Sequence, residues 1–414
     1  MPTEKYTALG FLSILLLISA STGATEAAIR HPIILVPGDG GSQIDAKLNK
    51  TEVVHYLCEK KTNDFFNTWL NLELLVPVVI DCLVDNLRLV YNNETRTTSN
   101  SPGVETRVPG FGDTSSVEWL DPSQLSLSKY FNNIANTLVS KLNYTRGVDL
   151  HGAPYDFRKA PNEHEEFFAN MEATIEETVK RNGQSAVIVT HSMGGLMALA
   201  FLQRQSQSWK DKHVSSLVTL AAPWGGSVKT VKVFVTGDNL GVIILSSGTL
   251  KDQQITSPSL AWLLPSSLFW KPDEPLVLTH EKNYSLSNLR DYFSDIDWLT
   301  GWEMRKDTEK YSLNFTAPGV EVHCAHGVGV ATVEQLKYAK DKFPDSSPGL
   351  IMGDGDGTVN LRSLEGCSKW NQAQNNGKKI YHQTFPGLDH MESLRNDKIA
   401  QFVLNLMRVK INVP

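Results

Sequence analysis

Long apolar runs, basic clusters and metal-ligand spacings are all missing from this 414-residue sequence. The apolar run near its start, 8–20, holds 13 residues, and no later segment reaches the roughly 18 that a membrane span requires. No basic run accompanies the formal charge of −6, so nucleic acid is not expected as a partner. Neither CxxC nor HxxxH occurs, and we therefore expect no metal site.

Repeats and low-complexity tracts are also absent, and 41% apolar with 20% charged residues is a globular composition. A chain of this length can bury a large core in one domain that carries insertions. Residues 1–24 predict a secretory signal peptide, because Lys5 precedes the apolar run and small residues follow it through Ala24. A signal anchor is the alternative. We expect the mature chain in a secretory, endosomal or extracellular lumen.

Only four cysteines are present, and they allow three pairings. Nearest-neighbour pairing joins Cys58 to Cys82 and Cys324 to Cys367. In an oxidising compartment each bridge would stabilise the fold by about 2–4 kcal/mol. Five Asn-x-Ser/Thr sequons fit the same compartment and are the expected glycosylation sites: Asn49, Asn93, Asn143, Asn283 and Asn314.

A nucleophile elbow is the most informative motif in the sequence. Residues 186–190, typical of a buried strand, run directly into the string HSMGG at 191–195. A strand that ends at x-Ser-x-Gly and turns sharply into a helix raises one serine hydroxyl above the sheet in α/β-hydrolases. Thr190 replaces the usual first glycine, so this is a variant elbow with Ser192 as its nucleophile. A tight structural turn is the alternative.

A serine nucleophile needs a base, and the base needs an orienting acid. In this fold the chain order is serine, acid and histidine. Residues 349–359 (GLIMGDGDGTV) form an apolar run that ends in a Gly/Asp turn, as expected of a strand followed by the acid. Asp354 and Asp356 are both candidates, and we favour Asp356. Either residue could instead serve only to shape the turn.

Only two of the eleven histidines, His382 and His390, follow this acid. His382 lies in a strand-like run, which favours a structural role. His390 follows the turn at 386–389 and precedes a helix with an apolar face, which is the position of the hydrolase base. His191, next to the serine, is expected to pack at the elbow.

Two backbone N–H groups are expected to stabilise the oxyanion of such a reaction. Met193 follows the nucleophile and supplies one of them. The strand and glycine-rich loop at 31–41 supply the other, which we assign to Asp39, although a simple tight turn would also explain the glycines. This chemistry requires no metal and no organic cofactor.

Strand and helix patterns alternate along the rest of the chain and predict an α/β fold with a mainly parallel sheet, the α/β-hydrolase fold. The core is expected to combine residues 25–47, 108–225 and 321–414. Strand-like runs lie at 33–36, 186–190, 215–220 and 349–352, and helical stretches at 124–142, 163–182 and 194–206.

Two long segments interrupt this pattern. Segment 48–107 carries the apolar stretch 69–80 between the first two cysteines, which predicts a membrane-binding insertion; a small satellite core is equally compatible. Segment 226–320 is long, rich in tryptophan and interrupted by glycines. It predicts a cap or lid that excludes water and shapes an acyl pocket, and a purely structural insertion is the alternative.

Over about 31–411 the sequence resembles the lecithin–cholesterol acyltransferase family, and within it the lysosomal phospholipase A branch. The resemblance rests on VPGDGGSQ (36–43), VVHYLC (53–58), WLNLELL (69–75), RLVYN (88–92), RVPGFG (107–112), YTRG (144–147), GAPYDFR (152–158), HSMGG (191–195), APWGG (222–226) and GDGDGTVN (353–360). Thr190 stands where that branch has a small residue, and Gly195 where it has a polar one. These two positions affect what can be inferred about substrate preference.

The resemblance implies a catalytic triad of Ser192, Asp356 and His390, oxyanion donors at Asp39 and Met193, and the two nearest-neighbour disulfides. It implies that the segment between the first two cysteines binds membranes and that 226–255 is a mobile lid over the lipid chains. Lys229 matches a family position near the head-group side of the site. Trp224, in the APWGG string, is the second expected substrate contact.

The sequence therefore predicts a luminal glycerophospholipid acyl hydrolase and transacylase, lysosomal or secreted, that passes acyl groups to water or to a lipid alcohol such as ceramide. One alternative is a secreted phosphatidylcholine–sterol acyltransferase; another, from a different class, is a catalytically inactive lipid-binding protein. Peripheral binding to a phospholipid surface is expected, favoured for anionic lipid at acid pH. With all 11 histidines protonated, they and the 39 Lys and Arg together would outweigh the 45 Asp and Glu by five charges.

Overall fold

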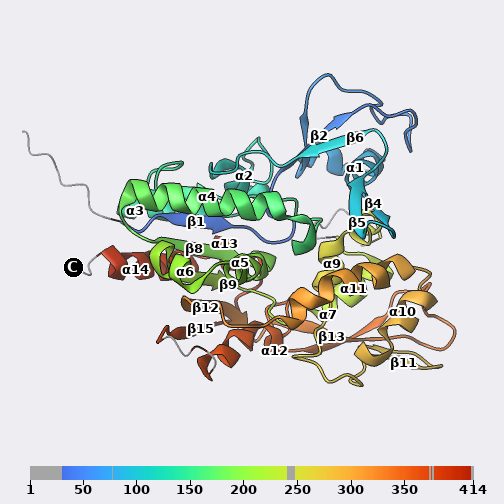
Figure 1. Cartoon of the computed structure of the whole chain (residues 1–414). Coiled ribbons are helices and arrows are strands. Elements are labelled where there is room, and N and C mark those ends of the chain that lie inside the picture. Colours follow the sequence, from blue (N-terminus) through green and yellow to red (C-terminus); the bar gives the residue numbers. More distant parts are fainter. Residues whose placement is uncertain (1–29, 77, 240–247, 373, 375–376, 412–414) are drawn as a thin grey trace, which may run out of the picture.

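The computed structural model describes residues 30–76, 78–239, 248–372, 374 and 377–411 (Figure 1). The expected signal peptide and residues 240–247 of the expected lid lie outside the described residues. Among the helices of the described part, none combines the length and the apolar character needed to cross a bilayer.

Six parallel strands form the central sheet, in the order β15-β12-β9-β8-β1-β7. The inner strands β1 and β8 are buried throughout, and they are apolar except for Thr190 and His191 at the end of β8, as expected of a parallel sheet covered on both faces. The expected parallel α/β sheet is thus confirmed. The strands are β1 (Ile33–Val36), β7 (Leu150–Gly152), β8 (Ala186–His191), β9 (Val214–Leu220), β12 (Glu321–Val328) and β15 (Ile380–Pro386).

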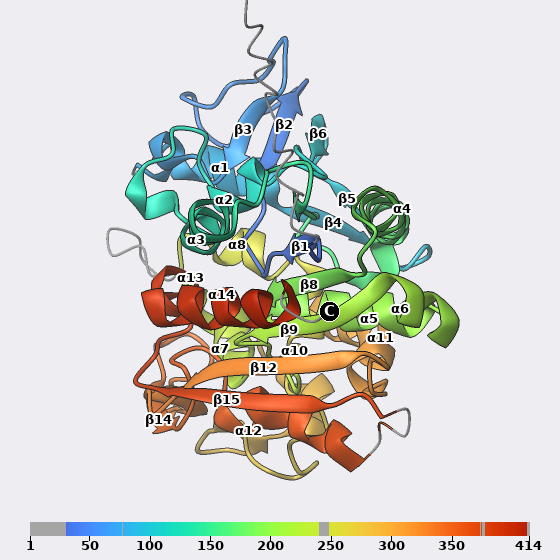
Figure 2. The same ribbon diagram turned by 90° about the vertical axis from the view of Figure 1, so that its left-hand side faces the viewer.

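Helices cover both faces of this sheet (Figure 2). One face carries α3 (Asn132–Leu142), α13 (Glu392–Arg395) and α14 (Asp397–Ile411). The other carries α4 (Glu165–Asn182), α5 (Met193–Arg204) and α6 (Gln207–His213). The predictions for α4 and α5 are correct to within two residues. The prediction for α3 starts too early, because Gln124 adopts a positive φ of 57° and Ser126–Ser128 form a separate 3-10 turn.

A second sheet of four strands has the order β11-β10-β13-β14. It combines β10 (Val277–Leu278) and β11 (Asn283–Tyr284) with β13 (Thr332–Lys337) and β14 (Gly349–Gly353). The run 349–352 is therefore a strand, as expected, but it pairs antiparallel with β13 and lies outside the central sheet. A short apolar run does not specify its partner, because the partner depends on tertiary contacts. The boundary expected at residue 320 also divides this second sheet.

Segment 226–320, which we call the cap region, shares a hydrophobic core with β13, and this core is separate from the one around the central sheet. Phe234, Trp270 and Tyr292 are among its fully buried side chains. Its helices are α7 (Val228–Thr236), α9 (Pro258–Trp262), α10 (Leu289–Asp295) and α11 (Leu299–Leu313), and α8 (Lys251–Gln254) packs on α7. Two further short helices are α2 (Ser115–Glu118) and α12 (Leu361–Leu364).

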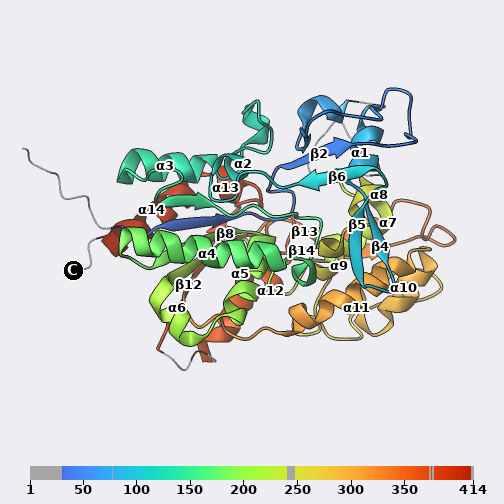
Figure 3. The ribbon, with the colours of Figure 1, turned by 45° about the horizontal axis from the view of Figure 1, so that its top comes forward.

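The 48–107 insertion holds short strands, an α-helix and a 3-10 turn at Leu72–Leu75, gathered at one end of the molecule (Figure 3). β2 (Ile44–Leu48) leads into it and pairs antiparallel with β3 (Phe66–Trp69) and β6 (Val104–Arg107). Between them lie α1 (Ile80–Leu87) and the hairpin of β4 (Leu89–Asn92) and β5 (Thr97–Asn100). The helix α1 packs against α8 of the cap region.

The apolar stretch 69–80 of this insertion has two kinds of residue. Trp69, Leu75 and Ile80 are at most 5% exposed and belong to the main core. Val76 and Val78, in contrast, are 46% and 45% exposed. Val54, Tyr56 and Leu57 on the neighbouring loop are also exposed, and we refer to these five side chains as the exposed apolar group.

Two disulfides join the cysteines as nearest neighbours, Cys58 with Cys82 and Cys324 with Cys367. The first ties the loop of Tyr56 and Leu57 to the start of α1, and the second is buried between β12 and the 365–372 segment. The asparagines of all five sequons are exposed, so each can be reached from solvent: Asn49, Asn93, Asn143, Asn283 and Asn314. Their glycosylation remains a prediction.

Candidate active site

The elbow at Ser192 has the strained backbone that lifts a side chain out of a strand-to-helix turn. Ser192 lies between β8 and α5 with φ 53° and ψ −129°, and its N–H donates to Leu220 O at 2.8 Å. The helix begins close beneath β1, since a Cβ on Gly194 would lie 2.4 Å from Val36 O. Thr190 fits at the variant position because its side chain is fully buried beside β9.

Gly195, the second departure from the lysosomal pattern, also has a steric explanation. A Cβ at this position would lie 2.6 Å from the Cβ of Ala222, where α5 passes the loop after β9. A larger polar side chain at this position would therefore require that loop to move away.

His390 joins the serine to an acid. Its Nε2 lies 2.9 Å from Ser192 Oγ, and its Nδ1 lies 2.7 Å from Asp356 Oδ2. The imidazole is 6% exposed and the carboxylate is fully buried. The structure thus brings together the three side chains that the sequence selects, with a histidine in reach of both a hydroxyl and a carboxylate.

The two carboxylate candidates, Asp356 and Asp354, have different contacts. Asp356 accepts N–H donors from Thr358 and Val359 at 3.1 and 2.8 Å, so the turn after β14 orients it toward His390. Asp354 instead accepts the N–H of Gly329 at 2.7 Å and is exposed. Asp356 therefore follows a strand as expected, although that strand belongs to the second sheet.

The remaining histidines near the site have other contacts. His382 Nε2 lies 2.7 Å from His326 Nε2 on the neighbouring strand, and burial lowers the pKa of both rings. His191 packs at the elbow between Tyr130 and His390. Burial, followed by the effect of a charged His390, holds the pKa of His191 well below its usual value.

The 37–41 loop lies directly against the elbow. A Cβ on Gly38 would be 2.7 Å from Ser192 Cβ, so only glycine allows this approach. Trp69 of the insertion supports the other side of the loop, where its indole N–H donates to Gly40 O at 2.8 Å. Asp39 lies in this loop, and Met193 is the first residue of α5, where a backbone N–H has no intrahelical acceptor.

The Asp39 side chain reaches solvent, yet protein atoms crowd around its carboxyl. Desolvation raises the pKa of Asp39 to about 7, and it outweighs the Gly40 N–H and the Lys229 charge, which act in the opposite direction. The carboxyl is therefore neutral in acid solution and ionised above neutrality, next to the elbow.

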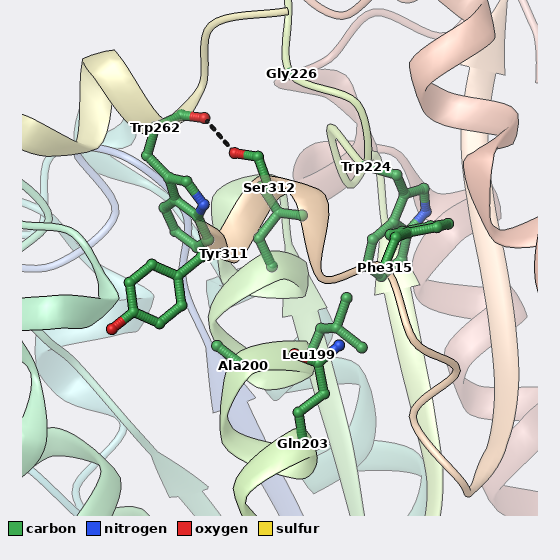
Figure 4. A pocket seen from close by; sticks show the side chains of 10 residues that line it. Leu199, Ala200, Gln203, Trp224, Gly226, Trp262, Tyr311, Ser312 and Phe315 are labelled. Atoms are coloured by element: carbon green, nitrogen blue, oxygen red, sulfur yellow. Dashed lines mark hydrogen bonds between the residues drawn. The ribbon is translucent and has the colours of Figure 1, made fainter. Parts of the chain in front are cut away.

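The two expected substrate contacts differ in exposure. Lys229, near the start of α7, lies 3.3 Å from Asp238 and acts electrostatically on Asp39. Trp224 is 2% exposed and packs edge-on against Trp370 with ring centroids 4.8 Å apart. It lines an apolar pocket with Leu199, Trp262 and Phe315 (Figure 4). The pocket has a volume of about 10 Å³, room for one water, so substrate contact at Trp224 remains a prediction.

Sequence reasoning missed Tyr130 and Trp69, both of which contact the 37–41 loop. Each is distant in sequence from the loop, and neither belongs to a local catalytic motif. No local signal marks them.

Comparison with known proteins shows the family of this chain. The family model for lecithin:cholesterol acyltransferase matches residues 65–401. Human lysosomal phospholipase A and acyltransferase is 46% identical over 388 residues, 94% of this chain and 93% of the relative. Human phosphatidylcholine-sterol acyltransferase is 40% identical over 362 residues, 87% of this chain and 81% of the relative.

The fold also has a counterpart among solved structures. A chain in the crystal structure of the Tle4-Tli4 complex matches with a TM-score of 0.54 at 14% identity, over 92% of this chain and 98% of that chain. At this identity the match concerns the fold alone. With its α/β-hydrolase fold, the chain belongs to the lecithin:cholesterol acyltransferase family and is an enzyme of the acyl hydrolase and acyltransferase class.

Proposed function

We propose that this enzyme removes acyl groups from glycerophospholipids through an acyl-serine at Ser192 and transfers them to water or to a lipid alcohol such as ceramide. The position of His390, within hydrogen-bond distance of both Ser192 and Asp356, carries the proposal. A second support is the 46% identity with the human lysosomal phospholipase A and acyltransferase.

In the first half-reaction His390 accepts the proton of Ser192 Oγ while that oxygen attacks the acyl carbonyl carbon. The ester C–O bond then breaks, and the lysophospholipid oxygen takes the proton from His390. In the second half-reaction water or a lipid hydroxyl attacks the acyl carbon and gives its proton to His390. That proton returns to Ser192 as a fatty acid or a transacylated lipid leaves.

Fixed groups of the protein stabilise the charges that develop in these steps. Asp356, held by two backbone N–H groups, fixes the histidine tautomer and stabilises the imidazolium. The backbone N–H groups of Asp39 and Met193 donate to the oxyanion. The cation of Lys229, on α7, suits the phosphate of a phospholipid head group.

The substrate of this reaction lies in a membrane, so the enzyme must bind at its surface. The exposed apolar group supplies side chains that can enter the lipid interface. We assign the enzyme to the lysosome lumen, to the secreted fraction, or to both, following its lysosomal and sterol-acyltransferase relatives.

Phosphatidylcholine–sterol acyl transfer is a second candidate. It is favoured by the 40% identity with the human enzyme and by the 41% identity with the chicken enzyme over 361 residues. The two candidates share the acyl-serine and differ in the acceptor, so one acceptor assay separates them.

Mixed liposomes that contain phosphatidylcholine, ceramide and cholesterol in equal amounts test the proposal. The wild type should release fatty acid and acylate ceramide in preference to cholesterol, as measured by mass spectrometry. Ser192→Ala should fold with an unchanged Tm yet lose both activities by at least about 10³-fold, since both pass through one acyl-enzyme. Preferred acylation of cholesterol would establish the second candidate, and residual transacylation in Ser192→Ala would contradict the acyl-serine.

A further inference from the structure

A buried chain of polar groups runs behind the proposed triad, from the 37–41 loop to His390. The N–H of Gly38 donates to the Tyr130 hydroxyl at 2.9 Å, and that oxygen lies 2.5 Å from His191 Nδ1. His191 Nε2 lies 3.2 Å from the carbonyl oxygen of His390. Tyr130 and His191 are 2% and 1% exposed, so the chain is shielded from water.

The chemistry of these groups allows a single direction of donation. A carbonyl oxygen can only accept, so the hydrogen of His191 must be on Nε2. Because its pKa is lowered well below the usual value, the ring is neutral and its Nδ1 carries a lone pair. The Tyr130 hydroxyl therefore donates to Nδ1, while its oxygen accepts the N–H of Gly38. Every group along the chain is then satisfied.

Tyr130, within this row of hydrogen-bonded groups, also contacts both ends of the loop. A Cβ on Gly38 would lie 3.1 Å from the Tyr130 hydroxyl, and a Cβ on Gly41 would lie 2.6 Å from the Tyr130 ring. The loop therefore closes around Tyr130, with the Asp39 peptide between its two points of contact. On the other side, the His191 and His390 rings are 4.9 Å apart.

We infer that Tyr130 and His191 are positioning residues, whose hydrogen bonds hold the Asp39 N–H and the His390 imidazole in register with Ser192. Neither side chain enters the reaction itself. The inference rests on the proposed function, since such positioning matters only if Ser192 and His390 react. Small displacements of reacting groups reduce rates strongly, up to about 10²-fold for 1 Å.

Tyr130→Phe tests this inference, because it keeps the buried ring and removes only the hydroxyl. Tyr144→Phe is the matched control. Tyr144 is also 2% exposed, and its hydroxyl donates to His31 O at 2.9 Å, before the start of β1 and therefore at the opposite edge of the sheet. Both variants lose one buried hydroxyl, but only one of them lies next to the proposed site.

The measurements are kcat and KM on a soluble short-chain ester, together with Tm. Tyr130→Phe should lower kcat by about 10- to 100-fold with KM within about twofold of the wild type. Tyr144→Phe should leave kcat within about twofold while lowering Tm. A kcat loss in Tyr130→Phe no larger than that in Tyr144→Phe would overturn the inference.

Two substitutions of His191 supply an independent readout. His191→Leu removes both hydrogen bonds, whereas the side-chain amide of His191→Gln can still donate to the His390 carbonyl. The kcat of His191→Gln should therefore be at least about tenfold higher than that of His191→Leu. Equal kcat values in the two variants would contradict the inference. Ser192→Ala in the same assay separates the two claims, because an active Ser192→Ala enzyme would refute the proposed function itself.

Discussion

The central sheet and the 48–107 insertion use their apolar residues in opposite ways. Every residue of β1 and β8 is buried, and these strands end at the loop and the elbow that form the site. In the insertion Tyr56 is 85% exposed and Val54 is 57% exposed, although both lie near a disulfide that orders the loop. Burial in the sheet fixes the geometry of chemical groups, while the exposed apolar group of the insertion is the surface that we propose binds membranes.

The largest expected effect lies on the buried side of this comparison. Asp356→Asn should lower kcat by about 10³- to 10⁴-fold, because the amide no longer selects the correct His390 tautomer. Asp354→Asn should lower it far less, since the Asp354 carboxylate accepts the N–H of Gly329, whereas His390 Nδ1 faces Asp356. Steady-state kinetics on a soluble ester compare the two variants. A larger loss of kcat in Asp354→Asn would show that Asp354, and not Asp356, is the acid.

A substitution to aspartate should have different effects at an exposed and at a buried position of the insertion. Val76→Asp places a charge on an exposed position and should lower activity on liposomes about tenfold while sparing a soluble ester. Ile80→Asp places the same charge in the main core and should destabilise the fold by more than about 3 kcal/mol, so both activities fall together. Equal losses of Val76→Asp on the two substrates would indicate a structural role for Val76.

A smaller effect is expected for the pH dependence at Asp39. Its pKa of about 7 means that the carboxyl is neutral in acid and becomes an anion above neutrality, close to the developing oxyanion. Activity should therefore fall as the pH rises through 7. Asp39→Asn keeps the backbone donor and should retain several-fold more of its pH 6 activity at pH 8 than the wild type does. Identical profiles on a soluble ester would exclude Asp39 as the titrating group.

The smallest effect is expected in binding to anionic vesicles. Burial lowers the pKa of five histidines, His31, His164, His191, His326 and His382, and that of His164 falls to about 4. Each of these five therefore binds a proton less readily in acid, so the formal charge rises by less than the eleven charges that full protonation would add. Sedimentation with anionic vesicles should then show binding only a few-fold stronger at pH 5 than at pH 7.5, with weak salt dependence. A large increase in binding at pH 5 that salt abolishes would indicate that these five histidines also become charged.

The site was largely predictable from sequence because its parts are local strings in a fixed order. The elbow at Ser192, the turn at Asp356 and the loop before the last helix at His390 each have a signature within a few residues. The sheet to which β14 belongs was not predictable, since its pairing with β13 is a tertiary contact. The division between buried Ile80 and exposed Val76 depends on which face of the insertion meets the core, and sequence spacing does not contain that information.

The order of the sheet has a consequence for the synthesis of this enzyme. A chain emerges from the ribosome from its N-terminus, so the Asp39 loop and Ser192 are synthesised before β15 and His390. Because β15 is an edge strand, the other five strands can pair without it. A partly made chain therefore displays a serine without its base.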